Sequence, residues 1–204
     1  MSKKLRLGLF GFGVVGQGLY DVLHKTKGIN AEVAKICVKH KDKPRPIDNK
    51  YFTFDKNDIL NDDSLDVVVE LIDNADEAFE IVSAALKKGK SVVSANKKMI
   101  AEHLKELYDL QQENNVSLLY EASVCGGIPI IRNLEEYYDH DLLHEVKAIV
   151  NGSTNFILTK MFEERLPFRE AQLTARQLGF AEADPRLDVE GYDAANKWVL
   201  LLNH

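Results

Sequence analysis

The chain has 204 residues, of which 45% are hydrophobic and 28% charged, and its formal net charge is −6. This composition is that of an ordinary globular protein, and the acidic balance without a basic stripe argues against a nucleic-acid partner. No apolar stretch is long enough to span a membrane, and the two cysteines, Cys37 and Cys125, exclude a disulfide framework and favour the reducing cytoplasm.

The first segment has the pattern of a dinucleotide-binding unit. A short apolar strand over residues 5–10 runs directly into the glycine turn Gly11-Phe12-Gly13-Val14-Val15-Gly16. A helical pattern follows to about residue 24, and a second strand over residues 32–38 completes a βαβ unit. In this setting Gly11 permits the turn, Gly13 lets the backbone approach a pyrophosphate, and Gly16 lets the helix pack on the strand.

The end of the second strand normally selects the cofactor. An acid there binds the ribose hydroxyls of NAD, whereas basic residues accommodate the additional phosphate of NADP. Here the strand ends in Val38-Lys39-His40-Lys41-Asp42-Lys43, without an acid at its tip. The sequence therefore favours NADP, with Lys39 as a phosphate partner, although NAD stays possible and a solvated basic turn is the alternative interpretation.

Strands and helices continue to alternate along the chain, which indicates a parallel, doubly wound sheet. Ligands in such sheets bind beyond the carboxyl ends of the strands, where Lys97 can be a functional group or an ordinary helix residue. The further strands are predicted at 66–71, 91–94 and 116–120, with helices at 77–88 and 98–114.

We predict an α/β chain with a Rossmann-type NAD(P)-binding domain over residues 1–130. Residues 131–204 then form the start of an α+β substrate-binding and dimerisation domain, with Pro129 opening a helix. A strand is predicted at 144–150, where it could join an intersubunit sheet. Ser153 or Thr154 is expected to cap the helix over residues 156–164.

The segment from Gly179 to Lys197 is rich in acids and leads into an apolar helix. Asp193 and Lys197 are four positions apart and share one helix face. The following residues 198–202 are apolar nearly all round, which predicts a buried helix, and a lysine at its head requires carboxylate partners. These groups suit a polar, zwitterionic ligand, although a solvated acidic loop beside an ordinary ion pair is the alternative. Because the chain stops inside this helix, we expect it to be the N-terminal portion of a longer protein.

Taken together, these motifs resemble homoserine dehydrogenases. The resemblance depends on the glycine turn, the acidic segment and the motifs between them, in family order over essentially the whole chain. Those motifs are Ala95-Asn96-Lys97-Lys98, Tyr120-Glu121-Ala122-Ser123-Val124, Gly126-Gly127-Ile128-Pro129 and Asn151-Gly152-Ser153-Thr154-Asn155. The resemblance implies reversible reduction of L-aspartate 4-semialdehyde to L-homoserine with NADPH or NADH, on the route to threonine and methionine.

The resemblance also implies roles for individual residues. Lys197 would donate a proton to the aldehyde oxygen, and Lys97 would contact both cofactor and substrate. Glu182 and Asp193 would hold the substrate amino group, with Asp188 nearby. The implied cofactor contacts come from Gly11, Phe12, Gly13, Val14, Val15, Gly16, Lys39, Ala75, Lys97 and Gly179. A monovalent cation such as sodium would bind main-chain carbonyls of Glu121, Val124, Gly126 and Ile128.

The resemblance further implies a cytoplasmic homodimer. One departure from the family pattern is Asp73-Asn74-Ala75-Asp76, where many relatives carry a Gly-Gly pair. Two other functions stay open from the residues alone. One is a non-catalytic NADP-sensing module, and the other is a thioester-forming semialdehyde dehydrogenase with Cys125 as nucleophile. Cys125 can equally be a small buried residue, and the six histidines show no metal-ligand spacing.

Overall fold

The computed structural model describes residues 3–26, 28–138, 143–181 and 185–203. These residues form two compact units, Met1–Gly127 and Ile128–His204. The first unit holds a six-stranded sheet, and the described part of the second unit is helical. No helix in the described part of the chain combines the length and the apolar character needed to cross a membrane.

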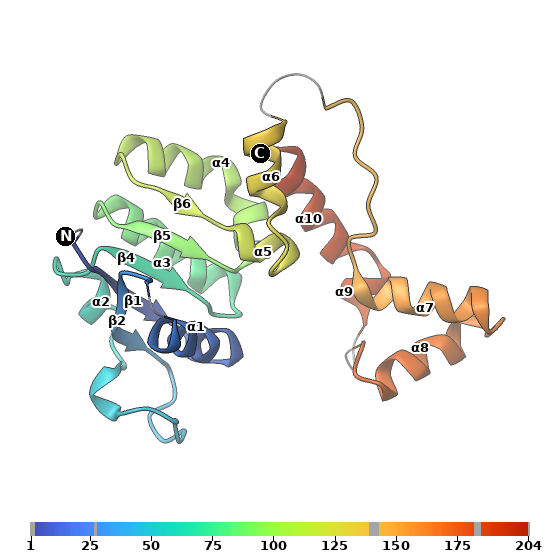
Figure 1. Ribbon diagram of the computed structural model, residues 1–204, viewed down its shortest axis with the longest axis horizontal. Helices are drawn as coiled ribbons and strands as arrows, with labels where there is room; N and C mark the ends of the chain where they lie inside the picture. The colour runs from blue at the N-terminus through green and yellow to red at the C-terminus, as the bar shows by residue number, and fades with distance from the viewer. Residues whose placement is uncertain (1–2, 27, 139–142, 182–184, 204) are drawn as a thin grey trace. The chain divides into compact units, whose positions relative to one another are not determined.

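The sheet of the first unit is entirely parallel, with the order β3-β2-β1-β4-β5-β6 (Figure 1). This is the strand order of a doubly wound dinucleotide-binding fold. The predicted parallel sheet is therefore confirmed, and only the two-residue strand β3 was not predicted. The strands are β1 (Leu5–Phe10), β2 (Ala31–Cys37), β3 (Phe52–Thr53), β4 (Val67–Glu70), β5 (Ser91–Ser94) and β6 (Leu118–Leu119).

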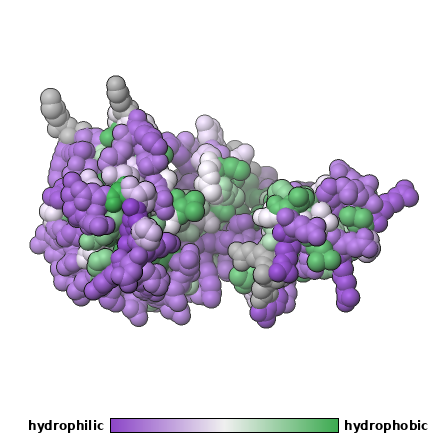
Figure 2. Space-filling view, turned by 90° about the horizontal axis from the view of Figure 1, so that it is seen from below, coloured by the Kyte–Doolittle hydropathy of each residue, from purple (hydrophilic) through white to green (hydrophobic). Residues whose placement is uncertain are grey.

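Helices cover both faces of this sheet. Right-handed crossovers place α1, which leads away to β2, opposite α3 and α4, which lead to β5 and β6. Leu19 and Leu23 of α1 pack against a buried cluster that includes Leu9 of β1, whereas α3 and α4 pack against each other. Polar side chains predominate on the face seen in Figure 2. The helices of this unit are α1 (Val14–Lys25), η1 (Asn49–Tyr51), α2 (Asn57–Leu60), α3 (Ala75–Lys87), α4 (Lys97–Glu113) and α5 (Glu121–Cys125).

The second unit is built around a helix pair. Its core is formed by Ile157 of α7 with Ala171 and Ala175 of α8, all of them buried. The small alanines let the two helices approach closely. The helices of this unit are α6 (Ile130–Tyr137), α7 (Gly152–Glu163), α8 (Phe168–Gln177), α9 (Arg186–Val189) and α10 (Tyr192–Leu202).

Three local predictions for this unit were wrong. Residues 144–150 form no strand, because no described segment pairs with their backbone N–H and C=O groups. Helix α7 begins earlier than predicted, so its cap is Asn151, whose Oδ1 accepts from Thr154 N at 2.8 Å. Helix α10 is not buried all round: Leu200 is inaccessible, but Leu202 is 72% exposed because no described side chain covers that face.

A buried carboxylate connects the ends of β4 and β5. Glu70 is fully buried, and its Oε1 accepts from Ile72 N at 2.7 Å. Its Oε2 accepts from Ser94 Oγ at 2.5 Å, and Ser94 Oγ in turn accepts from Asn96 N at 3.1 Å. Asn96 also donates from Nδ2 to Ile72 O at 3.1 Å. The loops after these two strands are therefore fixed to each other through the side chains of Glu70, Ser94 and Asn96.

We expect Glu70→Gln to change how stability depends on pH. Burial, together with the nearby Asp73 carboxylate, raises the pKa of Glu70 despite its hydrogen bonds. The folded chain thus retains this proton to higher pH than the unfolded chain. The free energy of unfolding of the wild type, relative to Glu70→Gln, should therefore fall as pH rises from about 5 to about 7. Urea denaturation of both proteins at both pH values measures this difference, and a constant difference would contradict the expectation.

Candidate functional site

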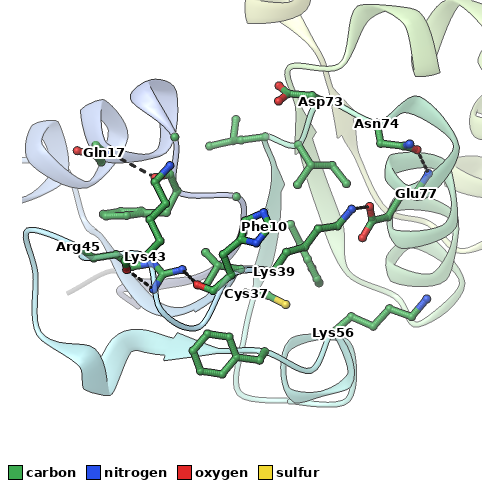
Figure 3. A pocket seen from close by; sticks show the side chains of 18 of the residues that line it. Phe10, Gln17, Cys37, Lys39, Lys43, Arg45, Lys56, Asp73, Asn74 and Glu77 are labelled. Atoms are coloured by element: carbon green, nitrogen blue, oxygen red, sulfur yellow. Dashed lines mark hydrogen bonds and ion pairs between the residues drawn. The ribbon is translucent and has the colours of Figure 1, made fainter.

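A cavity of about 480 Å³ lies at the carboxyl ends of the central strands of the first unit. It is formed by the loops that follow β1, β2 and β4, together with the start of α3 (Figure 3). This is the switch point of the sheet, where strand order reverses between β1 and β4. Its walls include Phe10, Gly11, Phe12, Gly13, Gln17, Cys37, Val38, Lys39, His40, Lys43, Arg45, Phe54, Lys56, Leu71, Ile72, Asp73, Asn74 and Glu77.

The three glycines of the turn occupy different environments. Gly11 has a φ of +98°, and a Cβ there would lie 2.7 Å from Leu71 O. A Cβ on Gly16 would lie 2.8 Å from Gly11 O, so α1 can pack on the turn only if residue 16 has no side chain. A Cβ on Gly13 would meet no atom within 4 Å, although Gly13 lines the cavity. The backbone at Gly13 is therefore open to a ligand, as a pyrophosphate requires.

The start of α1 is suited to an anion. Its N-cap is Gly13, no side chain caps the helix, and its first turn carries no acid. The first N–H groups of a helix lack intrahelical partners and form the positive end of the helix dipole. A phosphate bound at this end would accept hydrogen bonds from these N–H groups and would be attracted by the positive end of the dipole. The residues present therefore fit a dinucleotide.

Basic side chains line the opposite part of the cavity. Arg45 donates to Lys43 O at 2.9 Å and to His40 O, and its guanidinium lies 4.7 Å from the centre of the Phe52 ring. These contacts fix the loop after β2, so Arg45 acts first as a structural residue. Lys39 forms an ion pair with Glu77 of α3 (Figure 3). Lys56 pairs similarly with Glu80 at 3.2 Å.

Cys37 adds a thiol to the cavity wall at the end of β2. Burial raises the pKa of this thiol to about 11, and the carboxylates of Asp55, Asp58 and Glu77 act in the same direction. The thiol is therefore protonated at neutral pH and has little nucleophilic character. We interpret Cys37 as a neutral part of the wall.

The structure brings only some of the predicted cofactor residues to the cavity. Gly11, Phe12, Gly13 and Lys39 line it. Val14, Val15 and Gly16 form the first turn of α1, next to it in sequence. Ala75 is a buried residue at the start of α3, and Lys97 is the first residue of α4, after the cap Asn96. Gly179 belongs to the second unit, where it follows α8 with a φ of +79°.

The second unit contains a separate polar cluster around Lys197. Lys197 Nζ lies 2.9 Å from Asp193 Oδ2 and also donates to Val150 O. The side chains of Lys197 and Asp193 are 17% and 18% exposed. Asn151 Nδ2 donates to Asp188 Oδ1 at 2.7 Å and to Asp193 Oδ2 at 3.1 Å. Two predicted substrate acids and the predicted proton donor therefore share one network; Glu182 lies outside the described residues.

The sequence prediction missed the role of Asn151. One side chain caps α7 through its oxygen and bridges two carboxylates through its nitrogen. The spacing Asn-x-x-Thr immediately before an apolar helical pattern was an available signal for the cap. The bridge had no local signal, because Asp188 and Asp193 lie far along the chain from Asn151.

The residues of the predicted cation site are placed as follows. Glu121 and Val124 belong to the short helix α5, and Gly126 follows it with a φ of +60°. Ile128 is exposed and belongs to the second unit. Within residues 3–26, 28–138, 143–181 and 185–203, no group of three or more His, Cys, Asp or Glu side chains is arranged to hold a metal ion. A cation here depends on main-chain carbonyls and stays a prediction.

Two protein-family models match this chain. Residues 11–121 match the model described as "Homoserine dehydrogenase, NAD binding domain", and residues 129–204 match the model described as "Homoserine dehydrogenase". The first match covers the cavity and the glycine turn, and the second covers the Lys197 cluster. The first unit therefore contains an NAD(P)-binding domain.

Individual relatives agree with these matches. The homoserine dehydrogenase of Bacillus subtilis (strain 168) is 41% identical over 98% of this chain and 48% of its own length. A crystal structure of a homoserine dehydrogenase from Thiobacillus denitrificans has a TM-score of 0.88 and 36% identity, covering 97% of this chain and 48% of that one. A hyperthermophilic archaeal homoserine dehydrogenase in complex with NADPH has a TM-score of 0.82 and 30% identity, covering 97% of this chain and 68% of that one. The chain spans about half the length of the curated relatives it matches.

We expect Gly13→Ala to weaken dinucleotide binding without unfolding the chain. The φ of −77° at Gly13 suits alanine, and its Cβ would meet no protein atom, so stability should change by less than about 1 kcal/mol. The methyl group would occupy space that the pyrophosphate needs, and NADPH affinity should fall about tenfold or more. Nucleotide fluorescence measures affinity and thermal unfolding measures stability. Gly18→Ala, also in open space but outside the cavity wall, is the matched control. Equal affinities for the two variants would contradict the assignment.

Proposed function

The chain belongs to the homoserine dehydrogenase family, and on this premise we propose that it interconverts L-aspartate 4-semialdehyde and L-homoserine with NADP(H). The observation that carries the proposal is the network of Lys197, Asp193, Asn151 and Asp188. It combines a proton donor with carboxylates for a substrate amine. The cavity of the first unit supplies the fitting site for the cofactor, which provides the hydride when bound.

Lys197 is proposed as the proton donor to the aldehyde oxygen. Hydride addition to an aldehyde leaves an alkoxide that needs a proton from an acid within hydrogen-bond reach. Asp193 lies one helical turn before Lys197, and together with Val150 O it holds the amine in one orientation. Because the backbone of both residues belongs to α10, the amine is held without a large loss of entropy on substrate binding.

Asp188 and Asp193 are proposed to hold the substrate amino group, with Glu182 as a further carboxylate. An ammonium group has three donors and suits several carboxylate oxygens at once. Asn151 fixes both aspartates while it occupies only one oxygen of each. The uncharged amide of Asn151 thus holds the two carboxylates together by donating to both of them.

The remaining predicted contacts complete this proposal. Lys39 and the basic loop after β2 support NADP over NAD, since each adds a donor for a phosphate. Lys97, Ala75 and Gly179 are proposed near the nicotinamide end. Main-chain carbonyls of Glu121, Val124, Gly126 and Ile128 are proposed to bind a monovalent cation such as sodium. This last site is supported by family resemblance alone.

The proposal places this reaction on the route to threonine and methionine, in a cytoplasmic homodimer. Cys37 and Cys125 are both free, which agrees with a reducing compartment.

Lys197→Ala should abolish most turnover while the chain still binds NADPH. Loss of a general acid typically lowers the rate by about 10²–10⁴-fold. The assay follows reduced nicotinamide by absorbance with homoserine and NADP, and fluorescence measures NADPH affinity. Lys105→Ala, which removes an exposed lysine that pairs with Asp109, is the control. Turnover like that of the wild type would refute the role of Lys197, and a wild type without homoserine-dependent turnover would refute the proposed function.

Asn151→Ala and Asn151→Ser should separate the two roles of this residue. Alanine removes both the cap and the bridge, and should cost about 1 kcal/mol of stability. Serine restores the cap but cannot reach both carboxylates, so stability should recover while the KM for homoserine stays raised, by roughly tenfold. Steady-state kinetics and denaturant unfolding provide the two measurements. Recovery of KM in the serine variant would show that the bridge has no part in substrate binding.

A further inference from the structure

We propose that Glu77 of α3 sets the balance between NAD and NADP. In this proposal its carboxylate replaces the acid that is missing from the end of β2, and it competes with the phosphate of NADP for Lys39. The inference rests on the cofactor role proposed above, and it adds a residue from a different helix to the selection of the cofactor.

The geometry brings Glu77 to the position where cofactors are distinguished. Strand β2 ends at Cys37, and Lys39 follows it at the site of the adenosine ribose in this fold. Glu77 and Lys39 both line the cavity, and their side chains form an ion pair across it. Figure 3 shows the Lys39 amine directed at the Glu77 carboxylate. An acid therefore reaches the ribose site from α3.

Glu77 is more firmly held than its partner. Its backbone N–H donates to the Asn74 Oδ1 cap at 2.9 Å, so its Cα position is fixed in the first turn of α3. Its side chain is 34% exposed, whereas that of Lys39 is 63% exposed and lies on a loop. When a ligand enters, Lys39 is thus the partner that can move. The carboxylate stays in the cavity with either cofactor.

The two cofactors make opposite demands on a carboxylate at this place. The 2′-hydroxyl of NAD is a donor, and a carboxylate accepts from it. The 2′-phosphate of NADP is an acceptor with a charge near −2, which Lys39 attracts and Glu77 repels. Glu77 therefore favours NAD and Lys39 favours NADP. The preference for NADP is then smaller than the basic loop alone would produce.

The expected change in nucleotide affinity is modest because the ion pair between Lys39 and Glu77 is solvent-exposed. Exposed ion pairs contribute little, and a change of about two- to fivefold in affinity is their usual size. The test therefore needs ligands that differ only at the ribose. Adenosine 2′,5′-bisphosphate and adenosine 5′-monophosphate differ by the 2′-phosphate alone, and neither carries the nicotinamide.

The experiment titrates both nucleotides into the wild-type chain, Glu77→Gln and a control by calorimetry. Asp109→Asn is the matched control, since it makes the same charge change in the same unit, where Asp109 pairs with Lys105 outside the cavity. In Glu77→Gln the bisphosphate should bind about two- to fivefold more tightly, and the monophosphate should bind no more tightly than before. Circular dichroism confirms that each variant is folded.

The outcomes separate this inference from the proposed function. An unchanged or reversed ratio of the two dissociation constants in Glu77→Gln, or an equal change in Asp109→Asn, would overturn the role of Glu77. Homoserine turnover does not enter this test, so a chain without turnover can still support it. A wild-type chain that binds neither nucleotide would overturn both this inference and the cofactor site.

Discussion

The shape of the cofactor cavity depends on one close contact, between the turn after β1 and the residue that follows β4. No side chain fits at residue 11, because a Cβ there would lie 2.7 Å from Leu71 O. This contact brings the loops after β1 and β4 to the walls of one cavity, which Gly13 at the start of α1 also lines. The buried Glu70 carboxylate then holds the loop after β5 to the loop after β4 by side-chain hydrogen bonds. The position of these loops, and with it the shape of the cavity, is therefore set by close backbone contacts and buried hydrogen bonds. The side chains that line the cavity project from loops fixed in this way.

Much of the first unit could be predicted from the sequence, because its signals are local. Apolar strands, the glycine turn and alternation with helices each occupy consecutive residues, so the parallel sheet followed from them. Strand β3 has two residues, which is too short for any periodicity to appear. The ion pair between Lys39 and Glu77 joins a loop to a helix far along the chain. Such pairs depend on tertiary packing and have no local signal.

The second unit shows where patterns of hydrophobicity mislead. Residues 144–150 were predicted as a strand, but a strand needs a partner for its backbone, and none lies within the described residues. Helix α10 is apolar on several sides, yet among its own residues only Leu200 is buried in the described chain. In contrast, the prediction that Asp193 and Lys197 share a helix face was correct, since the spacing of one turn fixes it. Asn151 then joins this pair to Asp188.

The environment of Cys37 has a consequence for chemical durability. Sulfur at the rim of a redox cofactor is exposed to oxidants and electrophiles, which attack the thiolate. With a pKa of about 11, roughly one Cys37 in ten thousand is ionised at neutral pH. Partial burial, together with the nearby carboxylates, thus protects this sulfur from covalent modification. The cavity wall can therefore include the polarizable sulfur of Cys37 as a packing atom that has little reactivity.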